Sequence, residues 1–160
     1  MRITTKEVKH EVEGQEMTFQ IRKMDALHGS YLMKFCAEKF LPVLNDVQSL
    51  FSEPTPKKKA DAEELARKRT EQVIQLIPKA LMALSEEELI NFEVRCLQTV
   101  DVLKPAGWIC VMDGKSSFAI EELENDIKTV LLLCYEVVEF NMGSFFGGNS
   151  LTSVLNRQNT

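Results

Sequence analysis

The feature that most constrains the fold is a helical repeat of apolar residues near the C-terminal end of the chain. Between residues 120 and 138 the apolar side chains recur every three or four positions, at Ile120, Leu123, Ile127, Val130, Leu131, Cys134, Val137 and Val138. Acidic residues dominate the intervening positions, so that one face can be buried while the other is solvated. The longest uninterrupted apolar run, residues 130–135, is far shorter than the ~20 residues that cross a membrane. The repeat therefore predicts an amphipathic helix from about residue 120 that ends at Gly143.

The N-terminal segment shows the alternation of a strand instead. Its apolar residues Met17, Phe19 and Ile21 alternate with polar ones, which places them on one face of a strand. Residues 13–15 precede this strand and include a glycine, which tolerates the positive φ angles of a tight turn. Two valines before the turn give weaker support for a partner strand. The segment therefore predicts a β-hairpin.

Helices are predicted for most of the middle of the chain. Asp25 suits a helix N-cap, because its carboxylate can accept a hydrogen bond from a free backbone N–H. The residues after it form a broad apolar face made of Leu27, Tyr31, Leu32, Phe35, Cys36 and Phe40. Pro42 interrupts this helix, and a second short helix is predicted for residues 43–51. Helical spacing returns over residues 60–84, where Pro78 is expected to kink or divide the helix.

A capping box marks the start of the next helix. The Ser85 hydroxyl can accept from the backbone N–H of Glu88, whose side chain can reach back to Ser85, and the predicted helix runs to about Leu97. Residues 100–105 are interpreted as the segment that follows the end of this helix. The apolar, partly β-branched residues 108–112 then predict a strand, which ends at a turn containing Gly114.

These elements predict an α+β fold that is mainly α-helical. The N-terminal hairpin and the short strand at residues 108–112 are expected to form a small antiparallel sheet, since an isolated hairpin is only marginally stable. Residues 1–143 are predicted to make a single domain. Within it, residues 52–59 contain two prolines and three consecutive lysines and predict an exposed loop. Residues 144–160 are mostly polar and have little with which to build a core, so we expect a mobile C-terminal tail.

The sequence lacks the motifs of common metal, redox and nucleotide sites. The four cysteines, Cys36, Cys96, Cys110 and Cys134, lie far apart among apolar residues and are expected to be buried thiols in a reducing cytosol. Neither His10 nor His28 has a histidine or cysteine at ligand spacing. Gly114-Lys115-Ser116 resembles the end of a P-loop, but the preceding glycine, Gly107, is at the wrong spacing. We therefore expect no metal, no cofactor and no enzymatic activity.

The net charge argues against nucleic acid as a binding partner. One cluster of residues favours a protein partner instead. The net charge of −5 disfavours binding to a phosphate backbone. Aromatic and methionine side chains gather around the end of the last helix and in the segment after it, and such side chains suit an adaptable binding surface. The candidate partner-binding residues are Phe140, Asn141, Met142, Phe145 and Phe146. The alternative is that the phenylalanines fold back and cover the core.

Three stretches together resemble the tail assembly chaperones of tailed bacteriophages. The first, Thr-Phe-Gln-Ile-Arg-Lys-Met-Asp-Ala-Leu at residues 18–27, is a strand that runs directly into a helix. The second, Leu-Ser-Glu-Glu-Glu-Leu at residues 84–89, is a capped helix start before a tryptophan-bearing strand. The third, residues 136–146, is a closing helix that ends in Asn141 and is followed by a short segment containing phenylalanine. The resemblance covers most of the chain in the order of its elements.

The resemblance implies a function. Such chaperones bind the long tape measure protein before the tail tube polymerises around it, act without nucleotide hydrolysis and are absent from the finished virion. It implies a location in the bacterial host cytoplasm. The major tail protein is a further candidate partner, and self-association is a further candidate interaction. Two alternatives remain at this point: another small phage or prophage structural protein, such as a tail completion protein, and an enzyme with a scattered active site.

Overall fold

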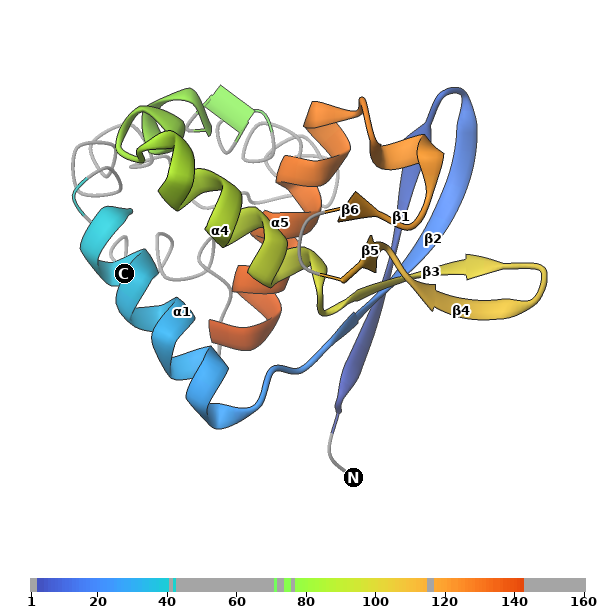
Figure 1. Ribbon diagram of the computed structural model, residues 1–160, viewed down its shortest axis with the longest axis horizontal. Coiled ribbons are helices and arrows are strands. Elements are labelled where there is room, and N and C mark those ends of the chain that lie inside the picture. The colour runs from blue at the N-terminus through green and yellow to red at the C-terminus, as the bar shows by residue number, and fades with distance from the viewer. Residues whose placement is uncertain are drawn as a thin grey trace, which may run out of the picture.

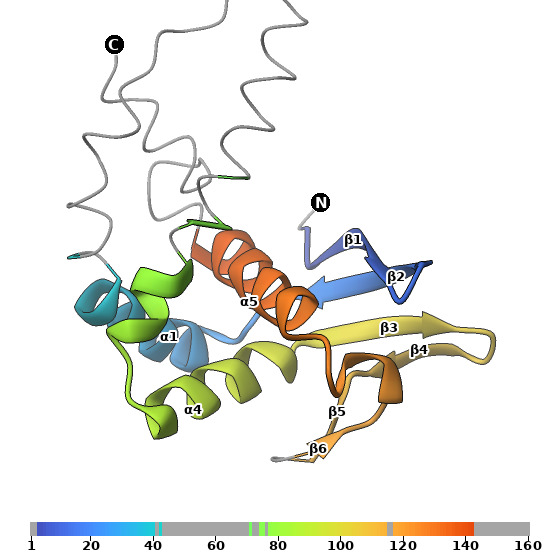
Figure 2. The ribbon, with the colours of Figure 1, turned by 90° about the horizontal axis from the view of Figure 1, so that it is seen from above.

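The fold combines a four-stranded antiparallel sheet with helices, as predicted for the α+β class (Figure 1). The computed structural model describes residues 3–40, 42, 71, 74–75, 77–114 and 117–142. The elements in chain order are β1 (Thr5–Val12), β2 (Gln15–Arg22), α1 (Ala26–Lys39), α4 (Glu86–Leu97), β3 (Val100–Lys104), β4 (Gly107–Cys110), β5 (Met112–Asp113), β6 (Ser117–Phe118), a 3₁₀ turn η2 (Glu121–Leu123) and α5 (Ile127–Met142). In Figures 1 and 2, α5 lies between the sheet and the pair of helices α1 and α4.

The N-terminal hairpin forms as predicted. Val12 pairs with Gln15, so the connection between β1 and β2 is a two-residue turn. Glu13 and Gly14 both have positive φ, 51° and 78°, which is the backbone of a type I′ turn. This turn matches the right-handed twist of the two strands and sets their register, which places Phe19 and Ile21 on the buried face of the sheet.

The sheet has more strands than the sequence predicts. Its order is β1-β2-β3-β4, and β5 and β6 form a separate two-stranded ladder. Residues 100–105 were expected only to leave the preceding helix, whereas Val100–Lys104 forms β3 and pairs with both β2 and β4. Val100 and Val102 are both fully buried on the same face as Phe19 and Ile21. The predicted strand at residues 108–112 is divided between β4 and β5.

Local capping groups determine where the helices begin. The Asp25 carboxylate accepts hydrogen bonds from the backbone N–H groups of Leu27 and His28, which confirms it as the N-cap of α1. Both hydrogen bonds of the capping box between Ser85 and Glu88 are present at the start of α4. The last helix begins later than expected, at Ile127 rather than near residue 120.

The delayed start of α5 has a physical cause in the residues just before it. The carboxylate of Asp126 accepts from the backbone N–H and the hydroxyl group of Thr129, as an N-cap does. The preceding η2 turn still buries Leu123, so part of the apolar repeat reaches the core through a tighter turn.

The core lies around α5. Leu133 and Val137 of this helix are fully buried, and α5 packs against α4, α1, β1 and β2. Cys96 and Cys134 belong to the same core. Within the described residues, no helix is both long enough and apolar enough to cross a membrane.

Several predicted segments lie outside the described residues. They are the short helix at residues 43–51, the loop at residues 52–59, most of the helix at residues 60–84 and the tail at residues 144–160. Residues 77–82 do have helical backbone, in agreement with the prediction for that part of the chain.

Candidate functional site

A groove lies between α1 and α4. The two helices run antiparallel, and their side chains meet at three successive levels. Lys39 forms an ion pair with Glu88 at 2.8 Å, and the rings of Phe35 and Phe92 stack at 5.4 Å between centroids. At the third level, the guanidinium group of Arg95 lies over the ring of Tyr31. These levels extend from the end at Lys39, which we call the closed end, to Arg95 in the middle of the groove.

The closed end is held by aromatic packing and by charge. Phe40 contacts both Phe35 and Phe92 edge to face, at 6.0 and 5.5 Å between ring centroids. Glu88 bonds to both Lys39 and Ser85, and these bonds, chiefly the one from Lys39, lower its pKa to about 2. Because Glu88 also completes the capping box, one carboxylate joins the start of α4 to the end of α1.

Two neighbouring cavities make up the groove, with volumes of about 520 and 340 Å³. Such volumes are within the range of sites that hold a ligand or a partner side chain. The larger cavity is lined by Arg22, Lys23, Met24, Asp25, His28, Leu32, Asn91, Val94, Arg95, Gln98 and Thr99. The smaller is lined by Tyr31, Leu32, Lys34, Phe35, Glu38, Lys39, Glu88, Asn91, Phe92 and Arg95. We call these residues together the α1–α4 groove.

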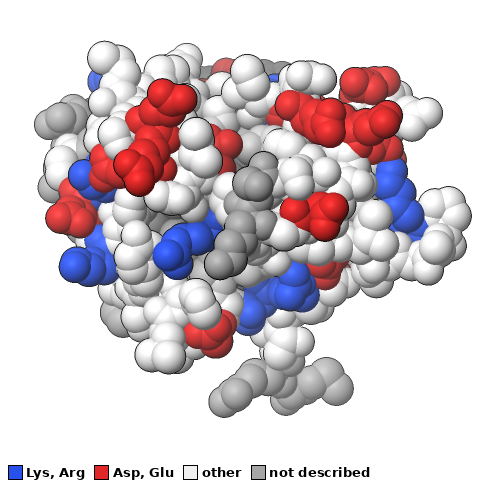
Figure 3. Space-filling model, viewed as in Figure 1, with Lys and Arg blue, Asp and Glu red and all other residues white. Residues whose placement is uncertain are grey.

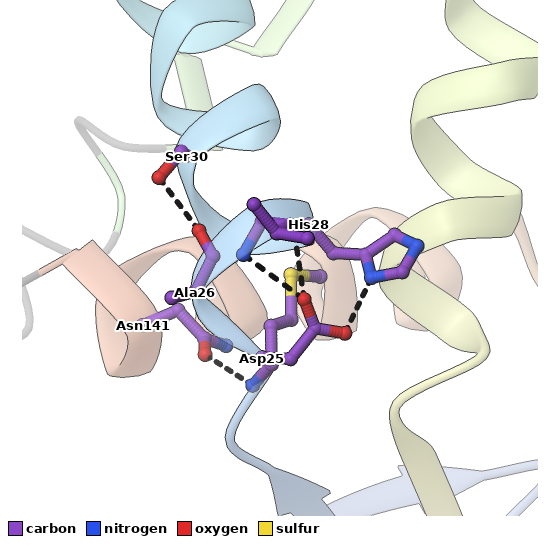
Figure 4. A network of polar contacts seen from close by, with 7 residues as sticks. Asp25, Ala26, His28, Ser30 and Asn141 are labelled. Carbon is purple, nitrogen blue, oxygen red and sulfur yellow. Dashed lines mark hydrogen bonds and ion pairs between the residues drawn. The ribbon is translucent and has the colours of Figure 1, made fainter.

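The open end of the groove is built from the segment that joins β2 to α1. The Asp25 carboxylate bonds to the first turn of α1 and to the Nδ1 atom of His28 (Figure 4). Hydrogen bonds from His28, first of all from its backbone N–H, lower the pKa of Asp25. Arg22 forms an ion pair with Asp101 at 3.0 Å and donates to the backbone carbonyl of Gln98 at 2.6 Å. This end therefore combines a polar wall with an apolar floor.

The groove has a charge balance opposite to that of the whole chain. Its lining contains the cationic residues Arg22, Lys23, Lys34, Lys39 and Arg95, and the acidic residues Asp25, Glu38 and Glu88. Figure 3 shows lysine and arginine side chains on the surface between α1 and α4, whereas acidic side chains gather over the start of α4 and over the loop before α5. A chain with a net charge of −5 thus presents a groove with a cationic excess.

Among the predicted partner-binding residues, the structure places three at the end of α5, beside this groove. Phe140 is half-buried, and its carbonyl accepts a hydrogen bond from Lys23, whose ammonium group lies over the Phe140 ring. Asn141 accepts from the backbone N–H of Met24 at 2.8 Å (Figure 4). It also donates to the Val137 carbonyl at 2.9 Å. Met142 is buried in the core. The remaining two candidates, at positions 145 and 146, lie outside the described residues.

The groove was not predicted from the sequence, although one of its walls was recognised as an apolar helix face. Leu27 and Tyr31 were expected to be part of a buried face, whereas they are 83% and 47% exposed. Leu32 and Phe35 do pack inward. The groove along this face is a tertiary feature, and helical periodicity alone carries no signal for it.

The described part of the chain contains no group of three or more metal-ligating side chains that could hold an ion. The four cysteines are free thiols, and burial raises the pKa of Cys36 to about 12. Neither histidine is near a cysteine in the described contacts, since His28 contacts Asp25 and His10 contacts Glu136.

Comparison with known proteins supports a single family. The model of a family described as phage tail assembly chaperone protein, TAC, matches residues 15–151. No curated protein and no solved structure shows a significant match to the chain. The matched region includes both helices of the α1–α4 groove.

Proposed function

The chain belongs to the phage tail assembly chaperone family, and we propose from this premise that it binds the tape measure protein through the α1–α4 groove. In this proposal, each copy covers an amphipathic segment of the tape measure protein until the tail tube assembles around it. The binding occurs in the cytoplasm of the bacterial host, requires no nucleotide hydrolysis, and ends before the virion is complete. Detection of the chain in purified phage particles would contradict the last point.

The observation that supports this function is the shape of the groove together with its lining. Phe35, Phe40 and Phe92 join the two antiparallel helices at one end, and the larger cavity lies toward the other end. The floor includes Leu32 and Val94, and the rim is polar. A helix laid in an apolar groove between two helices is a recurring mode of peptide recognition, in which residues at helical spacing serve as anchors.

The affinity of a single groove does not need to be high. A tape measure protein is long, so that many copies of the chaperone can bind along it, and multivalent binding strengthens the overall association without new contacts. A shallow groove of moderate affinity also permits release when the tail tube replaces the chaperone. The major tail protein is a second candidate partner at that stage.

The groove can be tested by filling it. Asn91 is exposed on α4 and lines both cavities, so that Asn91→Trp places a large ring in the groove without disturbing the core. We expect this variant to bind the tape measure protein of the same phage at least tenfold more weakly, which corresponds to about 1.4 kcal/mol. Its melting temperature should stay within a few degrees of the wild type, because a helix tolerates tryptophan at a cost of about 0.5 kcal/mol.

Glu86→Trp is the matched control, because Glu86 is exposed on the same helix and does not line either cavity. Co-expression with the tape measure protein, followed by pull-down and titration of the purified partners, measures both variants. Equal binding by the Asn91 and Glu86 variants would show that the partner does not use the groove.

We also propose that Phe145 and Phe146 anchor the partner next to the groove. Both lie just beyond α5, whose last turn contacts Lys23 and Met24 of the groove through Phe140 and Asn141. The double variant Phe145→Ala/Phe146→Ala is expected to bind over tenfold more weakly, since loss of an interface anchor costs about 2 kcal/mol or more. A normal thermal melt with weakened binding supports this role. A large fall in melting temperature, or unchanged binding, would contradict it.

A further inference from the structure

Arg95 lies at the centre of the α1–α4 groove and contributes to both of its cavities. Its guanidinium group is 4.3 Å from the centroid of the Tyr31 ring. Among the described residues, this ring is its only charge-related partner, and no carboxylate lies within ion-pair distance of it. An exposed cation–π contact is weak, whereas a carboxylate can accept two hydrogen bonds from a guanidinium group at once.

Most of the other charged groups of the groove are already engaged within the chain. Their pairs are Arg22 with Asp101, Lys39 with Glu88, Asp25 with His28, and Lys23 with the Phe140 carbonyl. Like Lys23, Lys34 has no carboxylate partner in the described contacts, but it lines only the smaller cavity, where Glu38 is also without an ion pair. The cationic excess is therefore greater in the larger cavity, to which Arg95 contributes.

We propose that Arg95 determines the specificity of the groove, by pairing with a carboxylate of an acidic amphipathic helix in the partner. This inference rests on the proposed function, and it adds the chemistry of the segment that binds. The helix places its apolar stripe toward Leu32 and an aspartate or glutamate beside that stripe, facing Arg95. Charge complementarity supports this occupant, because the groove carries a cationic excess in a chain of net charge −5.

The opposite kind of helix fits poorly. A segment with lysines beside its apolar stripe would bring like charges against Arg95 and Lys34 in a partly desolvated groove, and such juxtaposition disfavours the wrong partner. Arg95 therefore contributes both attraction toward acidic segments and repulsion of basic ones. The same reasoning predicts that the preference weakens as salt screens the charges.

The test uses two synthetic helical peptides with identical apolar positions. One carries glutamate and the other lysine at the positions that flank the apolar stripe, and binding to the full chain is followed by fluorescence anisotropy at low and high salt. The wild type is expected to bind the glutamate peptide at least tenfold more tightly at low salt. Arg95→Gln should remove most of this preference, while Lys128→Gln, a charge change on the exposed side of α5, should keep it.

The outcomes separate this inference from the proposed function. If both peptides bind the wild type equally, or if Arg95→Gln retains the full preference, the role of Arg95 is wrong even though the groove binds helices. If neither peptide binds, this inference is also wrong. If Asn91→Trp leaves binding of the tape measure protein unchanged, the proposed function itself fails, whatever the peptides show.

Discussion

Replacing Phe92 with alanine is expected to lower the free energy of unfolding by about 3–5 kcal/mol, as large-to-small changes of buried phenylalanines do. Phe92 is only 8% exposed, stacks on Phe35 and meets Phe40 edge to face. Its removal leaves a cavity at the closed end of the groove and takes from Phe35 and Phe40 the ring of α4 that both of them contact. Since these rings help to hold α1 to α4, we also expect binding of the tape measure protein to weaken.

Urea unfolding followed by circular dichroism measures this loss, and two variants calibrate it. Phe92→Met keeps most of the side-chain volume and should cost less than about 1.5 kcal/mol. Ile90→Ala changes a residue of the same helix that is 53% exposed, and should cost much less than Phe92→Ala. If Phe92→Ala were as stable as Ile90→Ala, the aromatic cluster would not be what holds the two helices together.

The second large effect is expected from a polar pair between the sheet and α5. The Nε2 atom of His10 lies 2.8 Å from Oε1 of Glu136, and both side chains are more than four-fifths buried. His10→Leu leaves the Glu136 carboxylate in the interior without this partner. Because removing one member of a buried pair exposes the full desolvation cost of the other, we expect a loss of about 3 kcal/mol at pH 7.

A double-mutant cycle identifies the cause of that loss. In His10→Leu/Glu136→Leu both polar groups are gone, and replacing a buried pair with apolar residues of similar size is often neutral. The double variant should therefore be more stable than His10→Leu alone. A double variant no more stable than His10→Leu would contradict this explanation.

Those features that depend on residues a few positions apart could be predicted from the sequence. The Asp25 cap, the capping box of Ser85 and Glu88, and the turn at Gly14 each use groups within four residues of one another. Such contacts form from local geometry wherever the surrounding chain permits them. The family was also recognisable from the order of these elements, and the match over residues 15–151 confirms it.

Strand β3 could not be predicted from the local sequence pattern. Val100–Lys104 is short and contains Asp101 and Lys104, so that nothing in its composition sets it apart from a connecting segment. It becomes a strand because β2 and β4 supply partners on both sides, and because Arg22 and Glu122 neutralise its two charges. β4 follows directly in the sequence, but β2 and Arg22 are distant, and tertiary pairing of this kind overrides weak local propensity.

The sequence by itself determined the class of fold, the hairpin, the starts of α1 and α4, and the apolar face of α5. Only the tertiary structure decided that α1 and α4 meet at Phe35 and Phe92 and leave a groove lined by Arg95, and that Asn141 bonds to the backbone just before α1. Periodicity shows which face of a helix is apolar, but it does not show which other helix covers that face or how much of it stays open. That depends on contacts between residues more than 50 positions apart, such as Phe35 with Phe92 and Tyr31 with Arg95.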